Sequence, residues 1–106
     1  AYGNSDLVRT KQIESILKKI LNKKHNVNIF CGDINTEYKS HSQLYLINSL
    51  KQNYSNCLFN QTKMSTFQLE QLDYIIYYGE DRPNLLYERI LSTKESDHHL
   101  LLCNVA

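Results

Sequence analysis

The sequence lacks any marked excess of charge: 12 basic residues stand against 11 acidic ones, for a formal net charge of +1. Such a chain has no strong long-range field for collecting nucleic acid or an anionic membrane. Any chemistry on phosphate groups would therefore have to come from a local site. Repeats and low-complexity tracts are lacking as well. A length of 106 residues, 42% of them hydrophobic, suits a single domain spanning 1–106.

Cysteine is scarce, and long apolar runs are missing. The three cysteines, Cys31, Cys57 and Cys103, show no CxxC spacing and are odd in number, so neither a zinc cluster nor a closed disulfide framework is indicated. No apolar stretch reaches the roughly 18 to 20 residues that span a bilayer, and no signal-like segment opens the chain. We therefore expect a soluble protein without a transmembrane segment, with a reducing, intracellular compartment favoured.

The pattern of apolar residues predicts alternating helices and strands. The expected elements are helices at 7–21 and 40–52 and strands at 27–31, 72–78, 90–93 and 99–105. Charged residues such as Arg9 and Lys11 on the first helix are expected to form a solvated surface. This order of elements indicates an α/β layered domain, in which a mixed or antiparallel β-sheet carries two helices on one face.

Both faces of the predicted strands are apolar. In the first strand, Val27 and Ile29 point to one face and Phe30 to the other, and the strand at 72–78 shows the same double pattern. Strands of this kind need cover on both sides. Because two helices shield only one side, we expect a body outside these 106 residues to cover the other.

Three polar motifs stand at the ends of the predicted strands. Gly-Asp-x-Asn at 32–35 follows the first strand, Leu-Asp-Tyr-Ile at 72–75 places an aspartate in a later one, and Ser-Asp-His at 96–98 precedes the last. Open α/β sheets place functional groups where strands meet loops, so three such motifs can converge in one acidic pocket. A pocket of this kind binds Mg²⁺ or Mn²⁺ through carboxylate oxygens and holds a histidine between two carboxylates.

Each motif taken alone also has a purely structural interpretation. Asp33 and Asn35 are good turn formers, because such side chains bond their own backbone. Asp73 suits a sheet edge, Asp97 suits the cap of a turn, and His98 suits a structural role. Hydrolysis of a phosphate ester, in contrast, needs both a cation to offset phosphoryl charge and a base for the attacking water. The three motifs together favour that chemistry.

In this order and strand context, the three motifs resemble those of the endonuclease/exonuclease/phosphatase superfamily, which includes DNase I-like nucleases, deadenylases, inositol phosphatases and neutral sphingomyelinases. Arg9 and Gln12 resemble the family's Arg-x-x-Gln helix, and Thr66-Phe67 resembles a looser feature, a small hydroxyl residue ahead of the Leu-Asp-Tyr strand. The family's early Asn and principal metal-binding Glu have no counterpart here. The resemblance therefore implies the C-terminal half of a four-layer α/β/β/α sandwich.

The resemblance also implies roles for individual residues. Asp33 would orient the attacking water, and Asn35 would hold a phosphoryl oxygen. His98 would contact the phosphate or act in acid–base chemistry, while Asp73 would pair with His98, fix its tautomer and raise its pKa. Asp97 would help to bind Mg²⁺ or Mn²⁺.

Two functions from different classes follow. In the first, the chain belongs to an active metal-dependent hydrolase of phosphodiesters or phosphomonoesters, completed by an N-terminal half-domain; nucleic acid is the favoured substrate, and lipid or inositol head groups are the alternative. In the second, the chain is an inactive half-domain that serves as a structural or binding module, with homodimerisation sheet on sheet. The first function is favoured, because clustered carboxylates repel one another without a cation.

Overall fold

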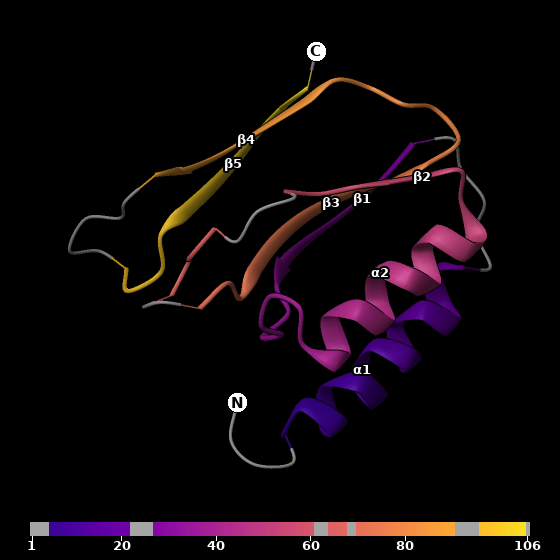
Figure 1. Cartoon of the computed structure of the whole chain (residues 1–106), viewed down its shortest axis with the longest axis horizontal. Helices are drawn as coiled ribbons and strands as arrows, with labels where there is room; N and C mark the ends of the chain where they lie inside the picture. The colour runs from indigo at the N-terminus through magenta and orange to yellow at the C-terminus, as the bar shows by residue number, and fades with distance from the viewer. Residues whose placement is uncertain (1–4, 22–26, 61–63, 68–69, 91–95, 106) are drawn as a thin grey trace.

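The computed structural model describes residues 5–21, 27–60, 64–67, 70–90 and 96–105. Its elements in chain order are α1 (Ser5–Ile20), β1 (Val27–Asp33), α2 (His41–Asn53), β2 (Asn56–Leu58), β3 (Asp73–Gly79), β4 (Leu85–Ile90) and β5 (Leu100–Val105). In Figure 1 both helices lie on one side of the sheet formed by β1, β2 and β3, and the β4–β5 pair lies on the other side. The predicted fold class, an α/β half-sandwich with an antiparallel sheet and two helices on one face, is confirmed.

The strands divide between two antiparallel sheets, whereas the sequence pattern suggested one. In the first sheet the order is β1-β3-β2, so both edges of β3 are already paired. The last two strands pair with each other instead, from Leu85↔Val105 to Ile90↔Leu100. The expected strand at 90–93 is thus placed earlier, at 85–90, and residues 91–95 lie outside the described part of the chain. The sequence did not predict β2, because three residues carry too little pattern.

The core lies between the helices and the three-stranded sheet. Ser40 caps α2, since its Oγ accepts the Gln43 N–H at 3.2 Å. The buried hydrophobic cluster takes residues from both helices, from the C-cap of α2, and from β2 and β3: Ile13, Leu17, Leu46, Ile47, Leu50, Tyr54, Cys57, Tyr74, Ile76 and Tyr78. Neither described helix is both long and apolar enough to cross a membrane.

The register between β1 and β3 assigns each residue to a face of the sheet. Residues paired directly across antiparallel strands share a face, so Phe30 and its partner Ile76 both turn toward the helices and the core. The alternate pairs turn the other way. On that second face Ile29 is 52% exposed, and the last pair is Asp33 opposite Asp73.

Arg9 corrects one expectation about α1. The sequence placed it on a solvated face, yet it is only 8% exposed, and its Nε and Nη1 atoms have no hydrogen-bond partner among the described residues. The reason is helical spacing: Arg9, Ile13 and Leu17 follow one another at intervals of four, so they share the face that packs on the core. Lys11 is exposed, as predicted.

Candidate functional site

The carboxylates of Asp33 and Asp73 stand opposite each other at one end of the three-stranded sheet. Asp33 is the last residue of β1, Asp73 is the first of β3, and the two are paired across the ladder. Directly paired residues in antiparallel strands have Cβ atoms about 5 Å apart. Like charges at that separation repel each other, so the pair calls for a cationic neighbour.

The imidazole of His98 supplies that neighbour. Its Nδ1 atom lies 2.6 Å from Oδ2 of Asp73, and its Nε2 atom lies 3.9 Å from Oδ2 of Asp33. One ligand atom from each of the three residues lies within 4.8 Å of the others. Because an ionised carboxylate only accepts hydrogen bonds, Nδ1 of His98 is the donor to Asp73. Nε2 is thereby left on the side of Asp33.

This environment raises the pKa of His98 above its ordinary value of 6.5. The hydrogen bond to Asp73 is the largest cause, and the charges of Asp73, Asp33 and Asp97 act in the same direction, whereas desolvation of the ring opposes them. The imidazole therefore keeps its proton to a higher pH than a free histidine does. As a cation it offsets the repulsion between the two carboxylates.

The turn after β1 fixes the orientation of Asp33. The backbone N–H of Asn35 donates to Oδ1 of Asp33 at 2.9 Å, which is an Asx turn. The N–H groups of Ile34 and Asn35 also donate to the Leu72 carbonyl, at 3.0 and 3.3 Å. Asn35 adopts a left-handed conformation, with φ of 57°, that asparagine tolerates better than most residues. Asp33 can both form this turn and serve the role that the resemblance implies, because the turn uses Oδ1 and leaves Oδ2 on the side of His98.

A buried polar network ties this turn to the segment that enters β3. The Gln71 N–H donates to Oε1 of Glu37 at 3.0 Å, and the side-chain amides of Gln71 and Asn60 bond each other at 3.1 and 3.2 Å. The hydroxyl of Tyr74 donates to the Thr36 carbonyl at 2.7 Å. Satisfied buried networks of this kind rigidify a structure. These bonds therefore hold the backbone next to Asp33 and Asp73 in a fixed arrangement.

The other predicted site residues stay outside the three-residue group. Asn35 and Asp97 are exposed, and neither side chain belongs to the group of possible metal ligands found among the described residues. Asp97 is nevertheless near enough for its charge to raise the pKa of His98. His99 contacts a different segment, since its Nδ1 lies 3.1 Å from the Ser65 carbonyl.

Thr66 and Phe67, which precede β3 in the chain, also contact residues of the site. The Phe67 and His98 rings have centroids 4.8 Å apart, and the two residues form an isolated β-bridge. The hydroxyl of Thr66 accepts the backbone N–H of Asp73 at 3.0 Å. The sequence assigned no role to either residue; its only signal was the small hydroxyl residue ahead of the Leu-Asp-Tyr strand.

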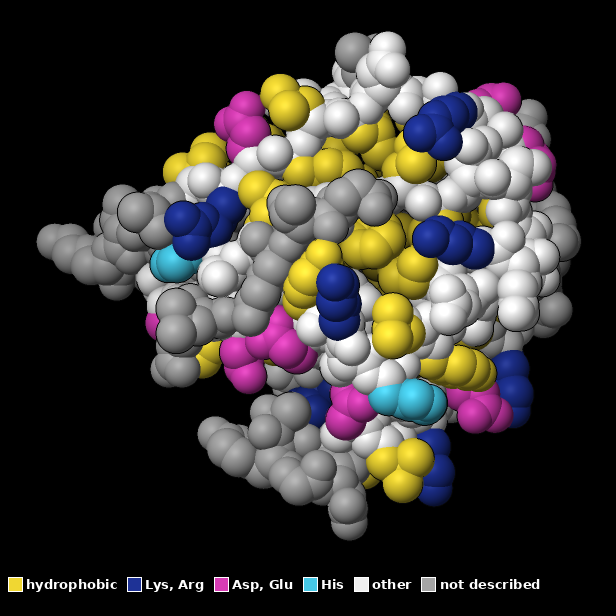
Figure 2. Space-filling model, viewed as in Figure 1, with side chains coloured by type: hydrophobic (Ala, Val, Ile, Leu, Met, Phe, Trp, Pro, Cys, Tyr) yellow, Lys and Arg dark blue, Asp and Glu magenta, His cyan; other side chains and the backbone are white. Residues whose placement is uncertain are grey.

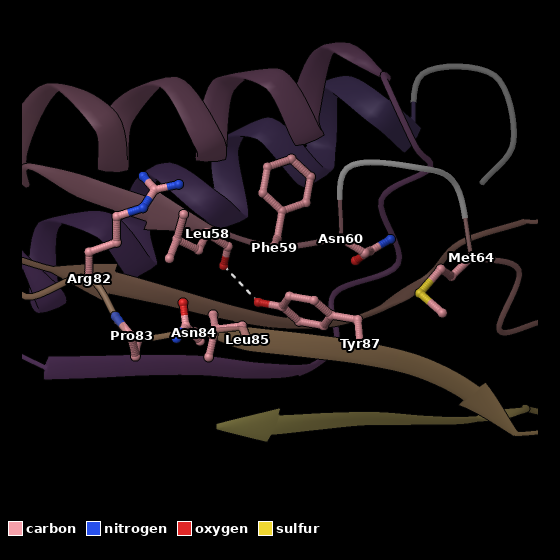
Figure 3. A pocket seen from close by; sticks show the side chains of 9 residues that line it. All are labelled: Leu58, Phe59, Asn60, Met64, Arg82, Pro83, Asn84, Leu85 and Tyr87. Atoms are coloured by element: carbon pink, nitrogen blue, oxygen red, sulfur yellow. Dashed lines mark hydrogen bonds between the residues drawn. The ribbon is translucent and has the colours of Figure 1, made fainter. Parts of the chain in front are cut away.

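The cluster lies at an open edge of the molecule rather than in its roomier cavities. A cavity of ≈ 450 Å³ separates β2 from β4, and the Tyr87 hydroxyl donates across it to the Leu58 carbonyl at 2.9 Å (Figure 3). Hydrophobic side chains gather at the surface in the middle of the view in Figure 2. A smaller cavity of ≈ 220 Å³ borders the cluster, with Asp73, Cys31 and Leu100 among its lining residues.

Comparison of the chain with models of protein families, with curated proteins and with solved structures gave no match. A functional assignment therefore has to be built from the chemistry of the site.

Proposed function

We propose that this chain is the C-terminal half of a divalent-metal-dependent phosphodiesterase of the endonuclease/exonuclease/phosphatase type. One observation carries the proposal: Asp33, Asp73 and His98, from three separate sequence motifs, meet within 4.8 Å. Two carboxylates and an imidazole can serve the hydrolysis of a phosphate ester, because such groups can hold a cation, orient water and transfer protons.

The donor set fits Mg²⁺ or Mn²⁺. These hard cations take oxygen ligands, and Mg²⁺ usually keeps several waters while binding one or two carboxylates. Asp33 offers a side chain that is 45% exposed, and the Asp97 side chain is exposed beside His98. We propose that Asp97 would help to hold the cation, as the resemblance implies, and that Asp33 would act on the attacking water rather than bind the cation. When bound, the cation would offset negative charge on the phosphoryl oxygens.

Residues of the chain are proposed to activate the water, to protonate the leaving oxygen and to bind the phosphate. In phosphodiester hydrolysis a water oxygen bonds to phosphorus, and the bond to the leaving oxygen breaks. We propose that Oδ2 of Asp33 would orient that water and accept its proton, because Oδ1 already accepts the Asn35 N–H in the turn. His98, held through Nδ1 by Asp73, offers Nε2–H to the phosphate and a proton to the leaving oxygen. Asn35 is proposed to hold a phosphoryl oxygen.

The β4–β5 pair lies on the side of the three-stranded sheet opposite the helices, and a second half-domain is proposed to cover the apolar strand residues that still remain exposed. Val27 and Ile29 of β1 are 58% and 52% exposed, and Leu100 and Val105 of β5 are 55% and 65% exposed. Exposed apolar strands of this kind favour association. The same exposed apolar residues support the second candidate, an inactive module that dimerises sheet on sheet.

Two measurements on the chain distinguish these candidates. Hydrolysis of bis(p-nitrophenyl) phosphate is followed with Mg²⁺, with Mn²⁺ and with EDTA, for the chain alone and for the chain together with any polypeptide that co-purifies with it. Light scattering reports the oligomeric state. Metal-dependent hydrolysis supports the enzyme. A stable homodimer without hydrolysis in either preparation contradicts it and supports the binding module.

Nucleic acid is the proposed substrate class, narrowly ahead of lipid or inositol head groups. The chain has eight tyrosines, and aromatic rings can stack on bases, but the net charge of +1 provides no broad basic surface. A labelled panel of DNA and RNA oligonucleotides, sphingomyelin vesicles and inositol polyphosphates tests the choice. Cleavage confined to the lipid or inositol substrates would overturn it.

A further inference from the structure

The strand ladders fix only one of the two contacts in the candidate site. Asp33 and Asp73 are neighbours in the β1–β3 ladder, so backbone pairing sets their separation. His98 precedes β5, which belongs to the other sheet. No ladder between β3 and β5 therefore holds His98 Nδ1 at 2.6 Å from Asp73. A hydrogen bond weakens steeply when its geometry is lost, so another element has to fix this distance.

Thr66 forms hydrogen bonds both to the start of β3 and to the backbone that follows His98. Its side chain is fully buried, and its Oγ1 accepts two backbone N–H groups, from Leu72 and Asp73, each at 3.0 Å. Its backbone carbonyl accepts the N–H of His99 at 2.5 Å. One residue thus joins the start of β3, where Asp73 lies, to the backbone that directly follows His98.

Phe67 adds a contact to the ring itself. The Phe67 N–H donates to the Glu70 carbonyl at 3.1 Å, and the Glu70 N–H donates to the Phe67 carbonyl at 2.8 Å, which ties the backbone next to Thr66 to the segment that enters β3. The Phe67 ring lies against His98, with centroids 4.8 Å apart and an interplanar angle of 51°. Contacts between tilted rings at this distance are favourable. They also limit rotation of the imidazole.

We propose that Thr66, supported by Phe67, is the positioning residue that holds His98 in register with Asp73. The proposal rests on the proposed function for its catalytic meaning, but its structural content stands apart from that function. The hydroxyl is the essential group, because its oxygen accepts the backbone N–H groups of both Leu72 and Asp73, and N–H groups shielded from water need an acceptor. Serine can supply the same acceptor. Valine, with nearly the same shape, cannot.

The test compares Thr66→Val with Thr66→Ser by two readouts. At high pH, where the imidazole is neutral, ¹⁵N NMR of the ring reports which nitrogen of His98 carries the proton. The parent chain and Thr66→Ser should both show Nδ1–H, whereas Thr66→Val should show a mixture of the two tautomers. In the hydrolysis assay, on the chain with its partner, Thr66→Val should lower kcat about 10- to 100-fold with little change in KM, and Thr66→Ser should restore most of it.

The outcomes separate this proposal from the proposed function. An unchanged tautomer and unchanged kcat in a folded Thr66→Val chain overturn the positioning role. A parent chain without hydrolysis, combined with a changed tautomer in Thr66→Val, overturns the enzyme and leaves the positioning role standing. If Thr66→Val does not fold, Phe67→Leu probes the same segment and keeps the buried hydroxyl. Loss of the ring contact should then mix the His98 tautomers, and an unaltered spectrum overturns the proposal.

Discussion

Nδ1 of His98 lies 2.6 Å from Oδ2 of Asp73, although the strands next to these residues belong to different sheets. The pairing neutralises one member of an aspartate pair that the β1–β3 ladder forces together. It also leaves Nε2 of His98 and Oδ2 of Asp33, 3.9 Å apart, at the partly exposed side of the cluster. The chemistry proposed for the chain depends on this arrangement.

The stability of the fold should fall as the pH rises above neutrality. His98 has its ordinary pKa of 6.5 in the unfolded chain and a raised pKa in the folded one, so the folded state binds the proton more tightly. The resulting stabilisation is fully present below about pH 6.5 and is lost as the pH rises through the raised pKa. Urea unfolding between about pH 5 and pH 9 measures the free energy of unfolding and checks this slope.

The Asp73→Asn variant tests the origin of the raised pKa of His98, because it removes the carboxylate that is its largest cause. NMR titration of the imidazole should then give a pKa closer to 6.5 than in the parent chain. Asp81→Asn, an exposed aspartate outside the cluster, is the control and should leave the titration unchanged. Equal titration curves for Asp73→Asn and the parent would contradict the contact.

Asp33→Asn should abolish most hydrolysis while keeping the turn after β1. The asparagine side chain retains an oxygen that accepts the Asn35 N–H, but it cannot take a proton from water. We expect turnover to fall by about 100- to 10,000-fold, the usual effect of losing a general base. Turnover is measured with bis(p-nitrophenyl) phosphate at saturating metal, with Asp81→Asn as the control. Turnover retained in Asp33→Asn would remove the role assigned to Asp33.

The cysteines should react with a thiol reagent in an order set by their exposure. Burial raises the pKa of the Cys57 thiol to about 11, so little thiolate forms at neutral pH. Cys31 is exposed on β1. Iodoacetamide should therefore label Cys31 first in the folded chain and Cys57 only after unfolding in urea, with peptide mass spectrometry as the readout. Equal labelling of Cys31 and Cys57 in the native chain would be inconsistent with the fold.

Arg9→Met should keep or increase stability despite removing a charge. The Nε and Nη1 atoms of Arg9 are buried without a partner among the described residues, and such groups cost about 1 to 3 kcal/mol each. Methionine preserves much of the apolar stem without the orphaned donors. Urea unfolding measures the change, and Lys11→Met, on the exposed side of α1, should alter it by less than about 0.5 kcal/mol. A clear loss of stability in Arg9→Met would show that the guanidinium is satisfied.

The local elements and their chemistry were readable in advance. Helical spacing located α1, and the run at 27–31 located β1, because periodicity depends only on near neighbours in the chain. The helix expected at 40–52 is α2, His41–Asn53. The same local pattern placed Asp33 just after a strand at 27–31 and Asp73 within a strand at 72–78, whereas β1 extends to Asp33 and β3 begins at Asp73. Helical spacing could also have predicted that Arg9 is buried, because it lies four residues before Ile13 on the same helix face. Its charge led to the opposite expectation.

The sequence by itself determined where both helices and the strands β1, β3 and β5 lie, to within about two residues, since each follows from short-range pattern. Only the tertiary structure decided that β4 and β5 form a separate sheet, that His98 bonds Asp73 from across that division, and that the hydroxyl of Thr66 bonds the backbone of Asp73. These contacts join residues far apart in the chain. Their geometry depends on how whole elements pack, which no local pattern specifies.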